Sequence, residues 1–204
     1  MTVTSTTTRV RPATAADAQA LAGVLARAFH HDPAGRWFFP AGATRARGLE
    51  RMFGALILPP AIAHGQTYTT EGLGGAALWT PPGAAERGGM LAQLRGLAAM
   101  ARIWGRDVRR AMRGFALLDE MHPHEPHHYL GILGVSPELQ GRGIGSALMQ
   151  PVLERCDRDG MPAYLEATTP RNRALYERHG FRVVLQARWP DFGPPLWPMW
   201  RDPA

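Results

Sequence analysis

Three glycines within five positions, Gly141, Gly143 and Gly145, constrain the fold of this chain more than any other feature. They lie between an apolar run, "YLGILGV", and a helical run that extends from about residue 144 to 159. Glycine allows a sharp turn from a strand into a helix and a close approach of a ligand to the backbone. The apolar run "PAYLEA" and the helical run "PRNRALYERHG" follow. This alternation predicts an α/β arrangement with a crossover connection.

The remaining apolar patterns add strands of a different kind. "VRPAT" predicts a short first strand, and "QTYTTEG" with "GGAALWTPPG" predicts a β-hairpin joined through glycines. "FRVVLQARW" and "PLWPMWR" are expected to close the chain as two strands. The predicted sheet is therefore mixed rather than purely parallel, unlike a doubly wound dinucleotide-binding fold.

Helical periodicity marks further segments. In "TAADAQALAGVLARAF", Thr14 and Asp17 form a capping-box-like pair before an apolar stripe. We expect a second helix over about 43–58, and two helices over 84–120, where glycines interrupt the pattern. "HDPAGRWFFP" breaks the first helix and is expected to be a loop over Asp32–Phe39. "PRNRALYERHG" predicts a helix with Thr169 as its N-cap.

Charge and composition limit the partners. A net charge of +6 admits a polyanionic ligand, and all 23 positive charges are arginine because the chain has no lysine. A Walker-type phosphate loop is therefore excluded, since that motif needs its lysine. Arginines are concentrated only at 87–113, which favours a solvated helical face over a nucleic-acid groove. We expect no nucleic-acid partner; the arginines of this run are 87, 95, 102, 106, 109, 110 and 113.

The expected location is the cytoplasm. Cys156 is the only cysteine, which excludes a disulfide framework within the chain and fits a reducing compartment. "MTVTSTTT" lacks the features of a signal peptide, and "GALILPPAIA" is too short to span a bilayer, so no membrane partner is expected. At 204 residues with 45% hydrophobic residues, the chain fits one domain, 1–204, with residues 1–8 expected to be frayed.

The glycine loop suits an anion. A helix N-terminus presents unpaired backbone N–H groups and a partial positive charge, which favours phosphate or pyrophosphate. The dinucleotide fingerprint G-x-G-x-x-G fails because Ser146 stands where its third glycine would be. What remains is Q-x-x-G-x-G, from Gln140 to Gly145. The alternative interpretation is a tight strand-to-helix turn without a ligand.

The surrounding sequence favours the ligand. "LGILGV" followed by Q-x-x-G-x-G and a later helix with Asn172, Tyr176 and "GF" resembles the GCN5-related N-acetyltransferase (GNAT) superfamily, which binds acetyl-CoA. Residues 122–201, the best-matching half, are similar to puromycin N-acetyltransferase-like proteins. The resemblance implies one N-acetyltransferase domain with a mixed, mostly antiparallel sheet of about six to seven strands and helices on both faces.

The resemblance also implies the donor site. The backbone of the glycine loop would bind the pyrophosphate of CoA, and the backbone of Leu133–Val135 would pair with the pantetheine arm. In the family this strand often carries a bulge and separates from its neighbour, which opens a slot for the acyl group. Gly131 and Gly134 would permit such a bulge. Asn172 would form a hydrogen bond with the pantetheine or phosphate region of CoA. The implied donor-binding residues are Leu133, Gly134, Val135, Gln140, Gly141, Arg142, Gly143, Ile144, Gly145, Ser146, Asn172 and Tyr176.

Two residues are candidates for catalysis. Tyr176 matches the family's general acid, which protonates the departing thiolate, and it lies on the same helix face as Asn172. Glu166, at mid-strand in "AYLEA", is a candidate to bind or deprotonate the amine; the alternative is a solvent-facing strand position. His127, His128 and water are the rival bases. "HPHEPHHY" also raises a metal hypothesis, but acetyl transfer needs no metal and no second ligand cluster exists, so we expect none.

The acceptor is less defined by the sequence. The resemblance implies a small-molecule amine, such as an aminonucleoside-type antibiotic, and thus a role in antibiotic resistance. A protein or peptide N-acetyltransferase and a non-catalytic acyl-CoA-binding regulator are the alternatives. Family members are often dimers, so a monomer or a homodimer is expected. Acceptor choice is expected to depend on the Asp32–Phe39 loop, the helices over 84–120 and the aromatic final strands. Five aromatic residues could line an apolar acceptor pocket, and the alternative for each is core packing; they are Trp37, Phe38, Trp79, Trp104 and Phe115.

Overall fold

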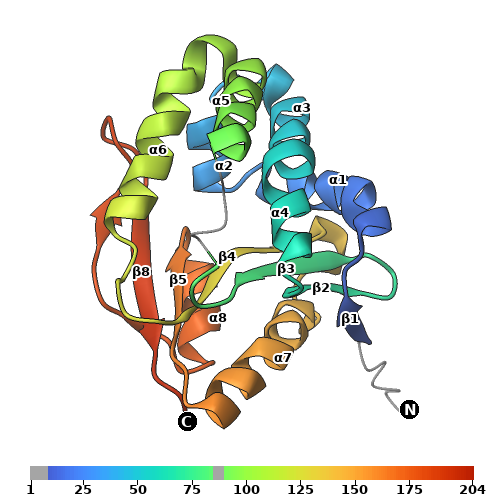
Figure 1. Ribbon diagram of the computed structural model, residues 1–204, viewed down its shortest axis with the longest axis vertical. Helices are drawn as coiled ribbons and strands as arrows, with labels where there is room; N and C mark the ends of the chain where they lie inside the picture. The colour runs from blue at the N-terminus through green and yellow to red at the C-terminus, as the bar shows by residue number, and fades with distance from the viewer. Residues whose placement is uncertain (1–8, 85–89) are drawn as a thin grey trace.

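A computed structural model describes residues 9–84 and 90–204 (Figure 1). The expected fraying of residues 1–8 and the position of Arg87 lie outside the described residues. None of the described helices is long and apolar enough to cross a membrane. The cytoplasmic location, the single-domain organisation and the oligomeric state stay predictions.

The described strands form a mixed sheet of eight, in the order β1-β2-β3-β4-β5-β8-β6, with β7 paired to β8. Among the described strands only β4 and β5 run parallel, and every other neighbouring pair is antiparallel. This confirms the mixed, mostly antiparallel sheet. The strands are β1 (Val10–Pro12), β2 (Thr67–Thr70), β3 (Gly75–Thr80), β4 (His128–Val135), β5 (Ala163–Ala167), β6 (Arg182–Val183), β7 (Ala187–Arg188) and β8 (Pro195–Arg201).

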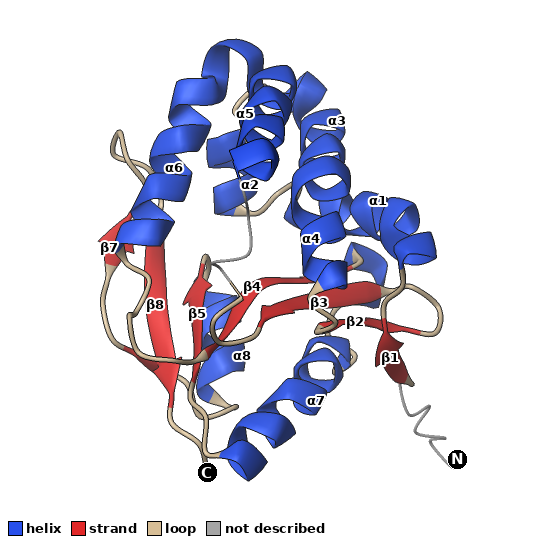
Figure 2. Cartoon of the chain, viewed as in Figure 1, coloured by secondary structure: helices blue, strands red, loops and turns tan. Residues whose placement is uncertain are grey.

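Helices cover both faces of the sheet (Figure 2). The alternation in β3 shows why: Ala76 and Leu78 join one apolar core, whereas Ala77 and Trp79 join the other. α1–α6 pack over the first core, and α7 and α8 pack over the second. The helices are α1 (Ala18–Phe29), α2 (Pro33–Phe38), α3 (Gly42–Met52), α4 (Leu58–Ala63), α5 (Met90–Trp104), α6 (Val108–Glu120), α7 (Ile144–Asp159) and α8 (Pro170–Glu177).

Local capping signals predicted several helix ends correctly. The Thr14 and Asp17 side chains form the expected capping box ahead of α1. α7 begins after Gly143 and ends before Gly160, and both glycines have positive φ, at 77° and 63°. Thr169 caps α8, and its side chain accepts from the backbone N–H of Asn172. These signals depend only on neighbours in sequence.

Three segments differ from the expectation. Asp32–Phe39 is not a loop: Pro33–Phe38 forms α2, because Asp32 caps it and Pro33 occupies its first turn. The helix expected over 43–58 continues to Ala63 through a π-helical turn at Phe53–Ile57, and the following α4 takes its two prolines into its first turn. "FRVVLQARW" is interrupted, and forms β6 and β7 instead of one strand.

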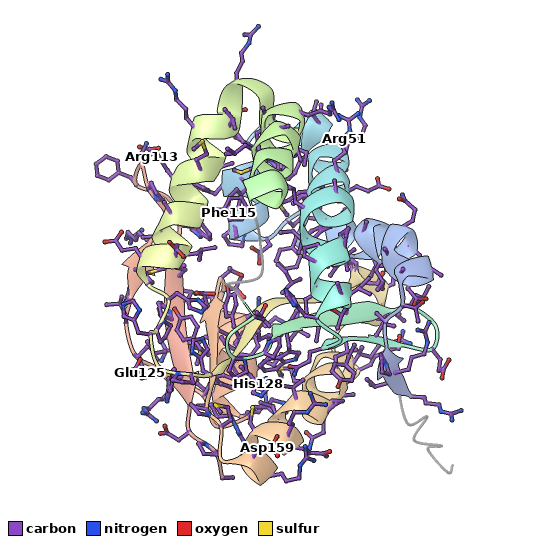
Figure 3. The ribbon with its side chains drawn as sticks, viewed as in Figure 1. Arg51, Arg113, Phe115, Glu125, His128 and Asp159 are labelled. Atoms are coloured by element: carbon purple, nitrogen blue, oxygen red, sulfur yellow. The ribbon has the colours of Figure 1, made fainter. Side chains whose placement is uncertain are left out.

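Of the two alternatives for the five aromatic residues, the structure has core packing and not an acceptor pocket: four are buried, and Phe115 is partly buried against the core. Trp37 and Phe38 pack against each other with ring centroids 5.1 Å apart, and Phe38 lies 5.2 Å from Phe115 of α6 (Figure 3). Trp104 contacts Phe115 at 5.9 Å, whereas Trp79 is fully buried on the opposite face of the sheet. Their rings fill space that the sequence pattern left available for a ligand.

β4 carries an irregularity that opens the sheet. Trp79 pairs with Leu130 and Leu78 pairs with Ile132, so Gly131 has no partner on β3 and forms a bulge. β4 pairs with β5 only over 128–130, whereas β5 continues beyond Leu165 against β8. β4 and β5 therefore separate after this point, as the resemblance implied.

Candidate active site

A cavity of about 590 Å³ lies where the sheet opens. Its wall combines the end of β4, the glycine loop, one face of α8 and the end of α1 with the residues that follow. Leu133, Gly134 and Val135 contribute from β4, and Asn172 and Tyr176 contribute from α8. Two segments singled out from the sequence thus meet at one cavity, although they lie about one helix and one strand apart in the chain.

Close packing of α1 on β4 forms one side of this wall. A Cβ on Gly134 would lie 2.6 Å from Leu25 Cδ2 and 3.3 Å from Ala28 Cβ, so any other residue here would displace side chains of α1. α1 ends at Phe29, and Ala28, Phe29 and Asp32 all line the cavity.

The glycine loop has a conformation that side chains rarely adopt. Gly141 and Gly143 have φ values of 79° and 77°, which explains glycine at both positions. A Cβ at either position would meet no atom within 4 Å, so backbone strain rather than packing requires the glycines. Gly143 is the N-cap of α7, so the first N–H groups of this 16-residue helix have no partner within the helix, and the residues that carry them, Ile144, Gly145 and Ser146, line the cavity.

Side chains around the loop hold its shape. Gln140 Nε2 donates to the carbonyl of Val135 at 3.1 Å, and Gln140 Oε1 accepts from Arg171 at 3.4 Å. Ser146 Oγ lies 2.9 Å from His179 Nε2. These contacts occupy the Gln140 and Ser146 side chains, although both residues line the cavity. Arg142 is exposed and is absent from the cavity wall.

α8 directs Asn172 and Tyr176 into the cavity. The two residues are four apart and therefore lie on one face of the helix. Tyr176 is 6% exposed. Burial raises the pKa of its hydroxyl well above the usual range, and the nearby charges of Asp32 and then Glu166 raise it further. Tyr176 therefore keeps its proton at neutral pH.

Asp32 lines the cavity, in a segment that the sequence associated with acceptor choice without giving Asp32 itself a role. Its Oδ1 accepts from the backbone N–H of Ala34 at 2.8 Å, and its Oδ2 accepts from Thr168 Oγ1 at 2.7 Å. Burial raises the pKa of the Asp32 carboxyl, although these hydrogen bonds oppose that rise. The Asp-Pro start of α2 was the sequence signal that would have placed it at a helix N-terminus.

Glu166 lies beside the cavity but does not line it. Its Oε2 accepts a 2.9 Å hydrogen bond from the Tyr129 hydroxyl, and its Oε1 is buried without a partner among the described residues. Burial raises the pKa of Glu166 to about 7, while the hydrogen bond from Tyr129 lowers it. A carboxyl that titrates near neutral pH suits a proton acceptor.

The rival bases differ in their surroundings. His127 Nδ1 lies 2.6 Å from the carbonyl of Glu125, so Nδ1 carries the proton, and Nε2 is buried without a partner among the described residues. His128 Nδ1 lies 3.0 Å from Gln66 Oε1, on the face of the sheet toward α7 (Figure 3). Burial lowers the pKa of both histidines. Neither residue lines the cavity.

No metal centre is assembled in the part of the chain that the structure describes. Across residues 9–84 and 90–204, no group of three or more His, Cys, Asp or Glu is placed to hold a metal ion. Cys156 is buried on α7, and burial raises the pKa of its thiol to about 11, so it is not an activated nucleophile.

The cavity brings together three groups of atoms with different chemical roles. Its glycine-loop end presents helix N–H groups to an anion, its β4 side offers backbone groups to an extended ligand, and Tyr176 supplies a neutral proton donor. The Glu166 carboxyl lies close enough to influence the pKa of Tyr176.

Solved structures of related shape cover nearly the whole chain. A Corynebacterium glutamicum protein described as "histone acetyltransferase HPA2 and related acetyltransferase" superimposes with a TM-score of 0.74 at 28% identity, over 97% of each chain. The PaiA N-acetyltransferase of Thermoplasma acidophilum, solved in complex with coenzyme A, gives 0.60 at 12% identity, over 95% of this chain and 98% of that one. The second likeness shows the fold alone.

Sequence comparisons agree over a shorter region. An uncharacterized N-acetyltransferase of Schizosaccharomyces pombe is 43% identical over 53 residues, which are 26% of this chain and 22% of that relative. The match thus spans about a fifth of the relative's length. The sequence pattern of the "Acetyltransferase (GNAT) family" matches residues 76–181, from β3 to the residue after α8 and its turn, and includes the glycine loop, Glu166 and Tyr176. With more than half of its length matched, this chain belongs to the acetyltransferase (GNAT) family.

Proposed function

We propose that this protein transfers an acetyl group from acetyl-CoA directly to the amine of a small molecule. The observation that carries the proposal is the single cavity that joins the glycine loop, the free side of β4, and Tyr176. The family uses acetyl-CoA, and membership makes it the expected donor. No metal takes part in the proposed reaction.

The donor would bind through the backbone. The N–H groups of the glycine loop, from Arg142 to Ser146, would bind the pyrophosphate of CoA at the N-terminus of α7. The peptide-like pantetheine arm would pair with Leu133–Val135, whose β5-facing side has no strand partner. Asn172, which lies on α8, would form a hydrogen bond with the pantetheine arm. The open space around Gly141 and Gly143 supports this assignment.

Tyr176 and Glu166 would move the protons. The amine nitrogen attacks the thioester carbonyl and gives a proton to the Glu166 carboxylate. The carbon–sulfur bond breaks, and the leaving thiolate takes the proton of the Tyr176 hydroxyl. Proton return through water then restores both side chains. Because Glu166 does not line the cavity, we expect a water molecule to link it to the amine; His127 is the alternative base.

Fewer observations support the identity of the acceptor amine than support the donor site. An aminonucleoside-type antibiotic follows only from the resemblance of residues 122–201, and the aromatic residues first assigned to its recognition are core. A protein or peptide amine is the second candidate. It is favoured by the likeness to the Corynebacterium glutamicum protein described as a histone acetyltransferase.

Two measurements test the proposal. Acetyl-CoA at 100 times its dissociation constant stabilises a protein by about 2.7 kcal/mol, so thermal unfolding should shift upward with acetyl-CoA and not with acetate. Release of free CoA thiol should then be followed across a library of amines that includes puromycin and a histone-tail peptide. No thermal shift would refute the donor site, and turnover with the peptide alone would favour the second candidate.

A further inference from the structure

Charged residues of both signs line the cavity. Arg171 lies at the glycine-loop end, since it donates to Gln140, and it lines the cavity together with Arg27 and Arg178. Among the described residues that line the cavity, Asp32 is the one carboxylate. An anionic donor is favoured beside the arginines and disfavoured beside Asp32.

Asp32 is held in a fixed position from two sides. Its Oδ1 accepts from Ala34 at the start of α2, and its Oδ2 accepts from Thr168, which directly follows β5. The carboxylate thus links the first part of the chain to the end of the strand that carries Glu166. Pro33 in the first turn of α2 fixes the backbone next to it. A carboxylate held in this way is positioned before any ligand arrives.

Asp32 also lies next to the group that we assign to the thiolate. Its charge is the largest electrostatic influence on the pKa of Tyr176, greater than that of Glu166. Tyr176 and Asp32 line the same cavity, whereas Glu166 does not. The reacting end of the cavity therefore carries a negative charge in a partly desolvated site, where electrostatic interactions are strong.

We propose that Asp32 binds the ammonium group of the acceptor, so that the protein selects amines that are cationic at neutral pH. This inference rests on the proposed function and adds the substrate class. Asp32 holds the ammonium beside the acetyl group. The ammonium first loses one proton to water, which gives the neutral amine, and the second proton leaves during attack and goes to the base assigned above. Thr168 acts as a positioning residue, because it orients the Asp32 carboxylate.

The test uses two isomeric amines. 2-Phenylethylamine is an ammonium ion at pH 7.5, whereas 4-ethylaniline has the same atoms and is neutral. Asp32→Asn keeps a residue with strong N-cap preference and removes the charge, and Asp32→Ser repeats the test with another strong N-cap. Asp107→Asn is the matched control, since Asp107 is the exposed N-cap residue of α6 and does not line the cavity.

A charged hydrogen bond contributes enough that its loss should raise the KM for 2-phenylethylamine by about 10- to 100-fold in both Asp32 variants. The KM for 4-ethylaniline and the calorimetric Kd for acetyl-CoA should stay within about twofold. Asp107→Asn should change none of these values. An equal rise for both amines, or a weaker acetyl-CoA Kd, would overturn the assignment of Asp32.

The outcomes also separate the inference from the function on which it rests. If the wild-type protein binds acetyl-CoA and acetylates 2-phenylethylamine, but Asp32→Asn leaves its KM unchanged, only the inference fails. If the wild-type protein acetylates neither isomer nor any amine of the library, the proposed function fails and the inference falls with it.

Discussion

The Tyr129 hydroxyl donates a hydrogen bond of 2.9 Å to Oε2 of Glu166, at the point where β4 and β5 part. Tyr129 is the last residue but one of β4 that pairs with β5, and Glu166 is the first residue of β5 beyond that pairing. The bond therefore bridges the two strands where their own hydrogen bonds stop. It also opposes the effect of burial on the pKa of Glu166.

We expect the contribution of Glu166 to the stability of the protein to fall as the pH rises between about 4.5 and 7. The pKa of Glu166 is about 7 in the folded protein and has an ordinary value of 4.5, so the folded state binds more proton across this window. Glu166→Gln should remove this part of the pH dependence in thermal unfolding measured from pH 4 to 8. An unchanged pH dependence would mean that the Glu166 carboxyl is not desolvated.

Activity, unlike this contribution to stability, should rise as the Glu166 carboxyl loses its proton. If the Glu166 carboxylate accepts the proton, kcat should rise with pH along a limb with an apparent pKa of about 7. Tyr129→Phe removes a hydrogen bond that lowers this pKa, so the limb should move to higher pH. The pH–rate profile of each variant checks this. A limb that persists in Glu166→Gln would transfer the role to His127 or to another group.

Replacement of Tyr176 should separate catalysis from binding. Tyr176→Phe removes the proton donor for the thiolate, and we expect kcat to fall by about 100-fold while the Kd for CoA is retained. The control is Tyr68→Phe, a buried tyrosine of β2 outside the cavity wall, which should leave kcat unchanged. Equal losses in both variants would point to a general effect on folding rather than to proton transfer.

The two ends of α7 offer a matched pair of glycine substitutions. Gly143 and Gly160 both have positive φ, and a Cβ at either position meets no atom within 4 Å. Alanine at either position should cost about 1 kcal/mol of unfolding free energy, measured by urea titration. Only Gly143→Ala should also weaken acetyl-CoA binding, as measured by calorimetry. A similar loss of affinity in Gly160→Ala would show that backbone strain at Gly143 is not specific to the ligand.

Much of the fold could be predicted because its signals are local. The bounds of α7 follow from its capping glycines, and the hairpin of β2 and β3 follows from alternation around glycines. From the sequence, Gly131 was expected only to permit a bulge in β4. The structure confirms the bulge, because Gly131 has no partner on β3. The cavity residues Asn172 and Tyr176 could be paired from their spacing alone.

The remainder depended on contacts between distant parts of the chain. Asp32 meets Thr168 across 136 positions, and no pattern near either residue indicates that contact. Trp37 and Trp104 are equally suited to a pocket wall or to a core, and only the packing of α2, α5 and α6 decides between them. Six residues of α2 are also too few for periodicity to reveal a helix.

The separation of β4 from β5 has a consequence for the protein without its ligand. From Ile132 to Val135, β4 pairs with β3 but with no other described strand, so the middle of the sheet contains an edge without a strand partner. Free edges of this kind template self-association, and proteins usually shield them with charges or with another segment. Occupation of this edge by an extended ligand would remove that template. Resistance to aggregation on storage or mild heating should therefore depend on the cavity being filled, quite apart from catalysis.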